Sequence, residues 1–351
     1  MERRGHPKAP NRPVWPKMNT PAISVVIPSY NGAERLPRTL ASLVGSRVEG
    51  GFEVLVVDDG SSDGTSEAAR AFADRLPISI QRHPQNRGRA AARNTAILSA
   101  RGGVVLILDD DMESSPGLIE RHLAAHRADP RSAAIGRIVQ EGLDPKTPFH
   151  AFLMREEESR RRRLLETPAP AFGEVWTGQF SADRQVAEGA GLFDEGIRAY
   201  GLEDIEFAYR LSRRGVRFVY LDDAVTRHAA FTDSLDRYCA RHASVGAVAA
   251  YLARRHDTPE MRRYLRIERQ PRARTSTFLR LMDASGALLR RPRAAAFLAG
   301  PVARPVLRAG VRALEAARLD RPLSFVYSFL RDIQYFNALG RALLTERGRR
   351  S

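Results

Sequence analysis

The sequence of 351 residues is poor in two residue types: it contains a single cysteine, Cys239, and only three lysines. One thiol excludes an intramolecular disulfide, which is typical of a protein of the reducing cytoplasm. The sequence also lacks any run of about 18 apolar residues without a charge, so we expect no membrane-spanning helix. Residues 1–20 are rich in proline and basic side chains and have no apolar run. We expect them to form a disordered arm rather than a signal peptide.

The net charge of +15 is distributed unevenly along the chain. Residues 1–230 are almost neutral, at +1, whereas residues 231–351 carry +14. A basic segment of this size indicates an anionic partner, such as a membrane lipid, a nucleic acid or an acidic acceptor. Because nearly all basic residues are arginines, a compositional preference for arginine over lysine explains the excess equally well. Both interpretations stay open at this point.

Apolar runs alternate with segments of helical spacing over the first 130 residues. Runs rich in β-branched residues predict buried strands at 22–28, 52–57, 78–81 and 104–108. Helical periodicity predicts helices at 34–43, 65–72, 90–100 and 116–127. Strand–helix alternation with short connections predicts an α/β fold with a mostly parallel sheet that is covered by helices on both faces.

Polar residues follow three of these strands at the points where the strands end. They are Ser29-Tyr30-Asn31, Asp58-Asp59 and Asp109-Asp110-Asp111. Because the carboxyl ends of parallel strands meet at one edge of the sheet, we expect one ligand site there. Three successive carboxylates repel one another, and a divalent cation such as Mg²⁺ or Mn²⁺ relieves that repulsion. An exposed acidic loop or a helix cap explains the triplet alone about as well.

Five motifs occur in order over residues 22–230: SVVIPSYN, EVLVVDDGSSDGT, NRGRAAARNTAI, VLILDDDM and GLEDIEFAYRLSRRG. In this order and spacing they resemble the family 2 glycosyltransferases, which have the GT-A fold. The resemblance implies a GT-A catalytic domain over residues 21–230, with a Rossmann-like, mostly parallel sheet, followed by a helical, arginine-rich region over residues 231–351. It also implies an inverting transferase that takes a sugar from a nucleotide-sugar donor, for which we expect a UDP-sugar.

The resemblance assigns residues to the donor side of the site. Pro28, Tyr30 and Asp59 match family positions that hold the nucleotide base and ribose, where an aromatic ring can stack and a carboxylate can accept hydrogen bonds. Simple roles in turns are the alternative for Tyr30 and Asp59. Arg89 and Arg93 match the region in which a basic residue faces the donor phosphates. For Arg93, an ion pair with the aspartates is an equal alternative.

The aspartate triplet matches the family's Asp-x-Asp motif. By resemblance, Asp111 is the main ligand of a Mg²⁺ or Mn²⁺ ion, Asp109 completes the pair, and Asp110 contacts the ribose or the metal. Some relatives place a histidine near position 228 as a further ligand, which makes His228 a candidate. A lone histidine is more often structural, so this assignment has a strong alternative.

Glu203 and Asp204 open a predicted helix, where the helix dipole favours negative charge and simple capping is the alternative role. The resemblance implies that Asp204 is the catalytic base, which takes a proton from the acceptor hydroxyl, and that Glu203 orients the acceptor or the loop. Gly178 and Gln179 match donor-contacting positions only in part, because the neighbouring residues differ from the family pattern.

The C-terminal region contains a predicted amphipathic helix at 299–319. Its apolar residues at helical spacing are Val302, Val306, Leu307, Val311 and Leu314, and its arginine stripe is Arg304, Arg308 and Arg312. Such a helix can pack its apolar residues on the catalytic domain. It can also lie on an anionic membrane surface. Both arrangements are compatible with the sequence.

The expected product is a saccharide, lipid-linked or small-molecule acceptor that carries one or a few added sugars. The Gln-x-x-Arg-Trp motif and the membrane spans of processive synthases are absent from the sequence. We expect a cytoplasmic protein, with peripheral attachment to the inner face of the plasma membrane as an alternative. The competing function is a non-catalytic basic protein that binds a membrane surface or a nucleic acid through a degenerate transferase domain. We expect no nucleic acid, because aromatic residues are not interleaved with the C-terminal arginines.

Overall fold

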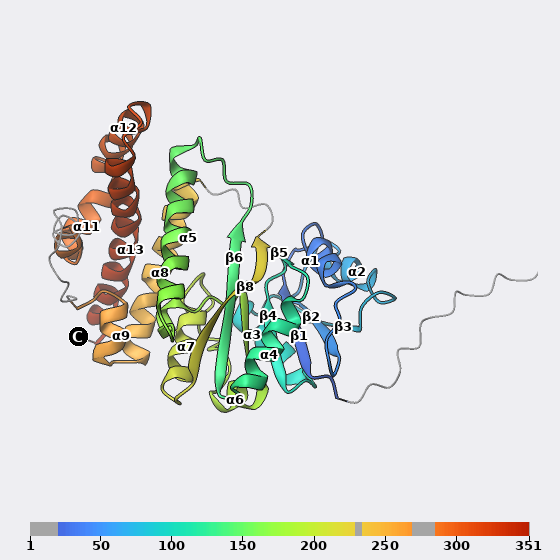
Figure 1. The fold of residues 1–351 in the computed structure, drawn as a ribbon. Coiled ribbons are helices and arrows are strands. Elements are labelled where there is room, and N and C mark those ends of the chain that lie inside the picture. Colours follow the sequence, from blue (N-terminus) through green and yellow to red (C-terminus); the bar gives the residue numbers. More distant parts are fainter. Residues whose placement is uncertain (1–19, 229–233, 269–284, 351) are drawn as a thin grey trace, which may run out of the picture.

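The computed structural model describes residues 20–228, 234–268 and 285–350 (Figure 1). The predicted N-terminal arm lies almost entirely outside these residues. Within them, an eight-stranded sheet has the strand order β3-β2-β1-β4-β7-β6-β8-β5. The sheet is mixed, because β7 and β5 pair antiparallel to their neighbours and the other strands pair in parallel.

The four predicted strands form one half of the sheet and pair in parallel. They are β1 (Ile23–Ser29), β2 (Phe52–Asp58), β3 (Ile78–Arg82) and β4 (Val104–Leu108). Every residue of β1, β2 and β4 is buried, as expected for strands that are covered on both faces. Their parallel register brings the carboxyl ends of β1 and β2 level, with Ser29 opposite Asp58.

The second half of the sheet contains strands that the sequence pattern did not predict. They are β5 (Met112–Ser114), β6 (Ser132–Gln140) and β7 (Gln179–Asp183). The apolar run at 218–221 lies near the start of a longer strand, β8 (Arg217–His228), and His228 is the last residue of this strand. The pairing of β5 with β8 places Met112, which follows the aspartate triplet, opposite His228.

Helices cover both faces of the sheet (Figure 1). One face packs against α1 (Leu36–Leu43), α2 (Thr65–Arg70) and α4 (Leu118–Ala128). The other packs against α3 (Arg89–Ser99), α6 (Arg184–Gly189) and α7 (Glu203–Ser212). Successive residues of β1 divide between the two hydrophobic clusters, with Val26 in one and Val25 and Ile27 in the other. This division follows from the two-residue repeat of a strand.

The C-terminal region is helical, as predicted, and extends the second of these hydrophobic clusters. It comprises α8 (Leu235–Arg255), α9 (Pro259–Tyr264), α11 (Pro292–Ala299), α12 (Ala303–Ala316) and α13 (Asp320–Arg350). Helix α13 packs against α8 and against α5 (Pro148–Glu166), and a short 3₁₀ turn (Phe172–Glu174) precedes β7.

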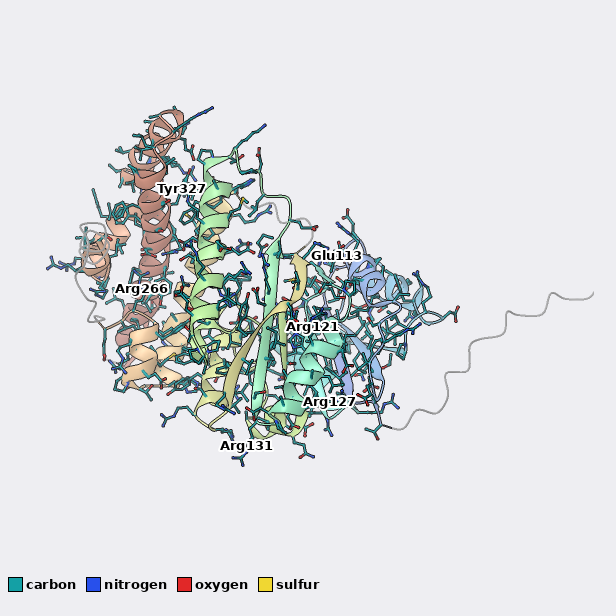
Figure 2. All side chains as sticks on the ribbon, viewed as in Figure 1. Glu113, Arg121, Arg127, Arg131, Arg266 and Tyr327 are labelled. Atoms are coloured by element: carbon teal, nitrogen blue, oxygen red, sulfur yellow. The ribbon has the colours of Figure 1, made fainter. Side chains whose placement is uncertain are left out.

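Aromatic contacts join the C-terminal region to the sheet-covering helices. The ring of Tyr327 on α13 lies 5.3 Å from that of Phe149 and 5.4 Å from that of Phe152, both on α5 (Figure 2). Contacts of this kind stabilise by about 0.5–1.5 kcal/mol beyond the area they bury. None of the described helices is both long enough and apolar enough to cross a membrane.

Candidate active site

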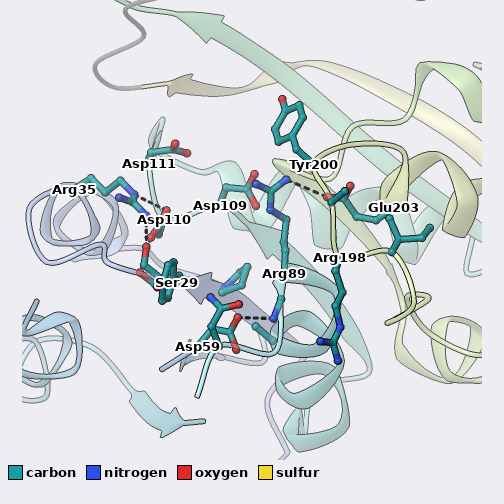
Figure 3. Close-up of a pocket in the computed structure, with 17 residues that line it drawn as sticks. Ser29, Arg35, Asp59, Arg89, Asp109, Asp110, Asp111, Arg198, Tyr200 and Glu203 are labelled. Atoms are coloured by element: carbon teal, nitrogen blue, oxygen red, sulfur yellow. Dashed lines mark hydrogen bonds and ion pairs between the residues drawn. The ribbon is translucent and has the colours of Figure 1, made fainter. Parts of the chain in front are cut away.

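A cavity of about 440 Å³ opens at the edge of the sheet where β1, β2 and β4 end (Figure 3). Eight residues predicted for the site line it: Pro28, Tyr30, Asp59, Arg89, Asp109, Asp110, Asp111 and Glu203. The other lining residues are Ser29, Arg35, Asn86, Gly88, Ala92, Ile197, Arg198, Ala199 and Tyr200. The cavity therefore joins the strand ends to the segment 197–203 that leads into α7.

Tyr30 and Asp59 have different surroundings within the cavity. Tyr30 follows β1 and is 47% exposed, so its ring is available to a ligand. Asp59 is buried, and its carboxylate accepts hydrogen bonds from the backbone N–H groups of Arg87 and Gly88, at 2.9 and 2.8 Å. Its Oδ1 also lies 2.6 Å from Nδ1 of His83. Asp59 thus holds the loop that leads into α3 against the end of β2.

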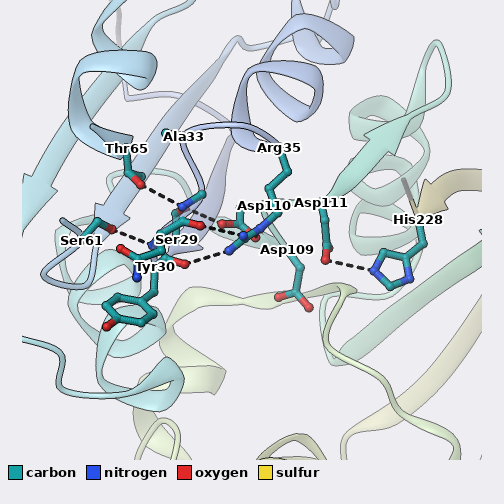
Figure 4. Close-up of polar contacts among 12 residues, drawn as sticks. Ser29, Tyr30, Ala33, Arg35, Ser61, Thr65, Asp109, Asp110, Asp111 and His228 are labelled. Atoms are coloured by element: carbon teal, nitrogen blue, oxygen red, sulfur yellow. Dashed lines mark hydrogen bonds and ion pairs between the residues drawn. The ribbon is translucent and has the colours of Figure 1, made fainter. Parts of the chain in front are cut away.

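Asp110 is held by Ser29, at the end of β1, and by Arg35, which the sequence analysis did not single out (Figure 4). Ser29 Oγ donates to its Oδ2, and Arg35 Nε donates to its Oδ1 at 2.9 Å. The same guanidinium also donates to the backbone carbonyls of Tyr30 and Asn31, both at 2.8 Å. Burial raises the pKa of Asp110, although Arg35 and Ser29 act in the opposite direction. Arg35 therefore ties the turn after β1 to the aspartate triplet.

Asp111 and His228 meet although they are far apart in the sequence (Figure 4). Nε2 of His228 lies 3.0 Å from Oδ2 of Asp111, and Nδ1 lies 2.7 Å from Oε1 of Gln140. Because the carbonyl oxygen of Gln140 can only accept, it orients the ring with the Nδ1 proton toward itself and Nε2 toward Asp111. Burial opposes ionisation of Asp111, but the hydrogen bond and charge of His228 outweigh it and lower the pKa of this carboxyl.

Asp109 takes part in a different contact, with the buried Arg93. The guanidinium of Arg93 donates to Oδ1 of Asp109 at 2.9 Å and to Oε1 of Glu203 at 3.1 Å. Only 1% of the Arg93 side chain is exposed, and the residue does not line the cavity. Arg93 thus lies behind the wall of the cavity, and its contact with the donor phosphates stays a prediction. The alternative ion pair does form, and it links the end of β4 to the start of α7.

Glu203 also binds a second arginine, at the wall of the cavity (Figure 3). Nη1 of Arg89 donates to Oε1 of Glu203 at 3.1 Å, and its guanidinium carbon lies 5.4 Å from the centre of the Tyr200 ring. Burial acts to raise the pKa of Glu203, but the charges of Arg93 and Arg89 outweigh it and lower this pKa. Glu203 is therefore an anion that is paired with two cations.

Asp204 has the opposite electrostatic environment from its neighbour Glu203. Burial, and next the negative charge of Glu203, raise the pKa of Asp204 to about 7. Its Oδ1 accepts only the backbone N–H of Ile205 among the hydrogen bonds of the described residues, at 2.8 Å. Asp204 is not among the lining residues of the cavity, but it is near Tyr200, which is one of them. Two adjacent carboxyls thus have pKa values that are shifted in opposite directions.

Gln179 lies in the interior and does not reach the cavity. It is fully buried in β7, where its carboxamide donates to the carbonyl of Ala224 at 2.8 Å and accepts from Thr226 Oγ1 at 3.0 Å. These hydrogen bonds leave no surface for a donor sugar, so the predicted donor contact does not fit this side chain. Gly178 supports the site indirectly, because its carbonyl accepts the backbone N–H of Asp109 at 3.1 Å.

The predicted metal ligands Asp109, Asp111 and His228 do not form one cluster. Among residues 20–228, 234–268 and 285–350, no three histidine, cysteine, aspartate or glutamate side chains converge as a metal site. The reason is that Arg93 holds Asp109, whereas Asp111 and His228 are adjacent. A carboxylate with an imidazole nitrogen nevertheless fits Mg²⁺ or Mn²⁺, which commonly take one or two protein ligands and complete their coordination with phosphate oxygens and water.

Three residues that line the cavity could not be predicted from the sequence, because no motif or pattern marked them as site residues: Arg35, Arg198 and Tyr200. Arg35 lies in the turn before α1, and its role depends on the proximity of Asp110, which is distant in the sequence. Arg198 and Tyr200 precede the Glu203-Asp204 pair, and only the folded chain brings them to the strand ends. Charge and aromatic character are too common in this sequence to have singled them out.

The sequence and the fold were compared with those of known proteins. Residues 24–187 match the family model described as Glycosyl transferase family 2. The chain is 29% identical over 256 residues to the uncharacterized glycosyltransferase YfnE of Bacillus subtilis, covering 58% of this chain and 64% of that protein. It is 32% identical over 254 residues to the pre-mycofactocin glycosyltransferase of Mycobacterium tuberculosis, covering 72% of this chain and 50% of that protein. The chain thus spans between half and two thirds of these curated relatives.

A solved structure extends the likeness to nearly the whole chain. The mannosyltransferase PcManGT from Pyrobaculum calidifontis, in complex with GDP-Man and Mn²⁺, has a TM-score of 0.58 and 21% identity, covering 91% of this chain and 87% of that chain. At this identity the likeness concerns the fold, and it confirms the predicted GT-A architecture. The matched family model spans β1 to β7, including the strand ends that form the cavity. Residues 24–187 therefore form a domain of glycosyl transferase family 2.

Proposed function

We propose that the protein is an inverting, non-processive glycosyltransferase that moves a sugar from a nucleoside diphosphate to a hydroxyl group of a saccharide, lipid-linked or small-molecule acceptor. One observation carries the proposal: a single cavity joins the carboxylates at the end of β4 to Glu203 at the start of α7. The carboxylates at the end of β4 suit a donor diphosphate that is bound through a divalent cation. Glu203 adjoins Asp204, a carboxyl whose pKa of about 7 is that of a general base. The glycosyl transferase family 2 domain supports the same reaction class.

The donor would bind along the strand ends, with its base near Tyr30. The exposed ring of Tyr30 can stack on a nucleobase, an interaction worth about 1–3 kcal/mol per base. Arg89 and Arg198 line the same cavity and supply positive charge for the diphosphate. The fold neighbour PcManGT was solved with GDP-Man, which supports a nucleotide-sugar donor as a class. For this chain we propose a UDP-sugar as the donor, and the experiment below also tests a GDP-sugar.

Asp111 and His228 would hold a Mg²⁺ or Mn²⁺ ion, with Asp109 facing the same cavity. Bound there, the cation would neutralise the charge that builds on the leaving diphosphate. The protein's own part is to orient these residues: Gln140 fixes the ring of the ligand His228, and the backbone carbonyl of Gly178 fixes the backbone N–H of the neighbouring Asp109. The complex of PcManGT with Mn²⁺ supports a divalent cation.

Asp204 would act as the base that takes the proton of the acceptor hydroxyl. A general base is most effective when its pKa lies near the working pH, and the pKa of Asp204 is raised to about 7. Glu203 is unsuited to this step, because Arg89 and Arg93 lower its pKa and occupy its Oε1 atom. Deprotonation by one carboxylate lets the acceptor oxygen attack the anomeric carbon directly. A single displacement of this kind inverts the configuration.

Donor binding is the experiment that tests the proposal. The melting temperature would be measured with UDP, GDP and their sugar conjugates, with and without Mn²⁺, on the wild type and on Asp111→Ala. A ligand that binds only the folded state stabilises it by about 2.7 kcal/mol at a concentration of 100 times its Kd. Asp74→Ala is the matched control, because it removes an exposed carboxylate from outside the cavity.

The two outcomes are clearly distinguishable. A metal-dependent rise with one nucleotide family, present in Asp74→Ala and lost in Asp111→Ala, would support the donor site and identify the base. If no nucleotide raises the melting temperature of the folded wild type, the transferase mechanism fails. A non-catalytic binding role would then take its place.

A further inference from the structure

Helix α12 has two apolar faces, and only one of them is packed. Leu307, Val311 and Leu314 belong to the hydrophobic cluster that covers the sheet. Val302 precedes the helix and Val306 lies in its first turns, and they are 73% and 71% exposed. The sequence analysis had placed all five residues on one stripe. They separate because Val302 and Val306 are four residues apart on the side of the helix that points away from Val311.

The outward face of α12 carries no charged side chain. Ala309 and Ala313 follow Val302 and Val306 at helical spacing, and both are exposed. Glu315 is the only acidic residue of this helix, and its Oε1 accepts a hydrogen bond from the hydroxyl of Tyr327. On the neighbouring helix α11, which contacts α12, the Phe297 side chain is 64% exposed. We name the set Val302, Val306, Ala309, Ala313 and Phe297 the α11–α12 apolar surface.

Positive charge surrounds this surface. Residues 285–319 contain seven arginines and a single acidic residue, Glu315. Arg304 and Arg312 are exposed, and within the described parts of the chain neither forms an ion pair. Arg308, between them, pairs with Asp236 of α8. Exposed apolar side chains beside unpaired arginines are complementary to a partner that has an apolar interior and an anionic surface.

We propose that the α11–α12 apolar surface docks the protein on an anionic membrane. An amphipathic helix in the plane of a bilayer inserts its apolar side chains at the boundary between headgroups and acyl chains, while its arginines bind lipid phosphates. A second copy of the chain fits less well, because a two-fold contact through this surface would bring two sets of unpaired arginines together. This inference goes beyond the proposed reaction and does not depend on it.

Helix α12 lies at the top of the molecule in Figure 1, whereas strand β5, which follows the aspartate triplet, lies about half-way down. Arg213 and Arg214 lie just before β8, at the opposite end of this strand from His228. These two exposed arginines therefore provide a control pair that is distant from β5 and has the same charge as Arg304 and Arg312.

The test is co-sedimentation of the full chain with vesicles of phosphatidylcholine alone and of phosphatidylcholine mixed with phosphatidylglycerol. No nucleotide is added, so failure of the proposed reaction would leave this result unaffected. The variants are Val302→Asp/Val306→Asp, Arg304→Gln/Arg312→Gln and the control Arg213→Gln/Arg214→Gln. All six positions are exposed, so each variant should fold, and circular dichroism checks this.

We expect the wild type to bind the mixed vesicles, to bind phosphatidylcholine alone weakly, and to be released by salt. Each arginine near an anionic surface contributes about fivefold in affinity, so Arg304→Gln/Arg312→Gln should bind about 25-fold more weakly. Val302→Asp/Val306→Asp should lose binding, and the control pair should retain it. A Val306→Trp variant should in addition show a blue-shifted emission when mixed vesicles are added, relative to the wild type.

Two results would overturn the proposal. The first is a folded wild type that does not bind mixed vesicles, or whose binding falls equally in the control pair and in Arg304→Gln/Arg312→Gln. The second is a dimer in light scattering that Val302→Asp/Val306→Asp converts to a monomer, in a protein without vesicle affinity. That second result would assign the surface to another copy of the chain.

Discussion

Replacing Arg93 by methionine tests the link between the two halves of the site. Arg93 is 1% exposed and donates to Asp109 and to Glu203, whose side chains are 28% and 7% exposed. Methionine has a similar length and fills much of the same space, so the change removes the charge with little loss of packing. What remains is Glu203 in a buried position, with Arg89 as its only other cation among the described ion pairs.

The expected cost follows from this burial. Removing one partner of a buried ion pair typically destabilises a protein by about 3–5 kcal/mol, because the other charge stays buried without compensation. Arg89 also contacts Glu203, but it is 46% exposed, so water screens its contribution to about 0–1 kcal/mol. We therefore expect Arg93→Met to lower the free energy of unfolding by about 3–5 kcal/mol, and Arg89→Met by less than about 1 kcal/mol.

Urea unfolding followed by circular dichroism measures both values. Arg198→Met is the matched control, since Arg198 lines the same cavity but is exposed and should change stability by less than about 0.5 kcal/mol. The double variant Arg93→Met/Glu203→Leu should recover part of the loss, because it removes the uncompensated carboxylate. An Arg93→Met protein as stable as Arg198→Met, or a double variant that adds a full second loss, would refute the reasoning.

Three further predictions concern the base and the backbone. Asp204→Asn should lower kcat by about 10²–10⁴-fold while the donor-induced rise in melting temperature is retained, whereas an active variant would exclude Asp204 as the base. Because the base must be ionised and the pKa of Asp204 in the free protein is raised to about 7, kcat/KM of the wild type should rise with pH through neutrality and level off above it, and a flat profile there would contradict this role. Gly60→Ala should destabilise the protein by about 1–3 kcal/mol, since φ is +78° and a Cβ atom would lie 2.6 Å from the carbonyl carbon of Gln85. Gly64→Ala has a similar φ of +85° without that clash, so a smaller loss in urea unfolding is expected from it.

Much of the fold could be predicted from local pattern. Strands β1, β2 and β4 are buried on both faces, and such strands need continuous runs of apolar residues that are visible in the sequence. Strands β6 and β7 were missed because their buried positions include small and polar residues such as Ala133, Ser181 and Gln179. Such polar residues can be buried because they form hydrogen bonds with residues far away in the chain. Ser181, for example, forms hydrogen bonds with His122 and His126.

The sequence alone determined which residues could gather at the edge of the sheet. Parallel strands must end at one edge, so the positions of Tyr30, Asp59 and the aspartate triplet directly after their strands were enough to assign them to one site. The sequence did not determine which carboxylate pairs with which cation.

Only the tertiary structure decided those pairings. It placed Arg93 between Asp109 and Glu203, brought His228 to Asp111, buried Gln179, and turned Val302 and Val306 outward. The physical reason is that the energy of a charge or a polar group depends on burial and on the distance to its partners. Both quantities exist only once segments far apart in the sequence have packed together.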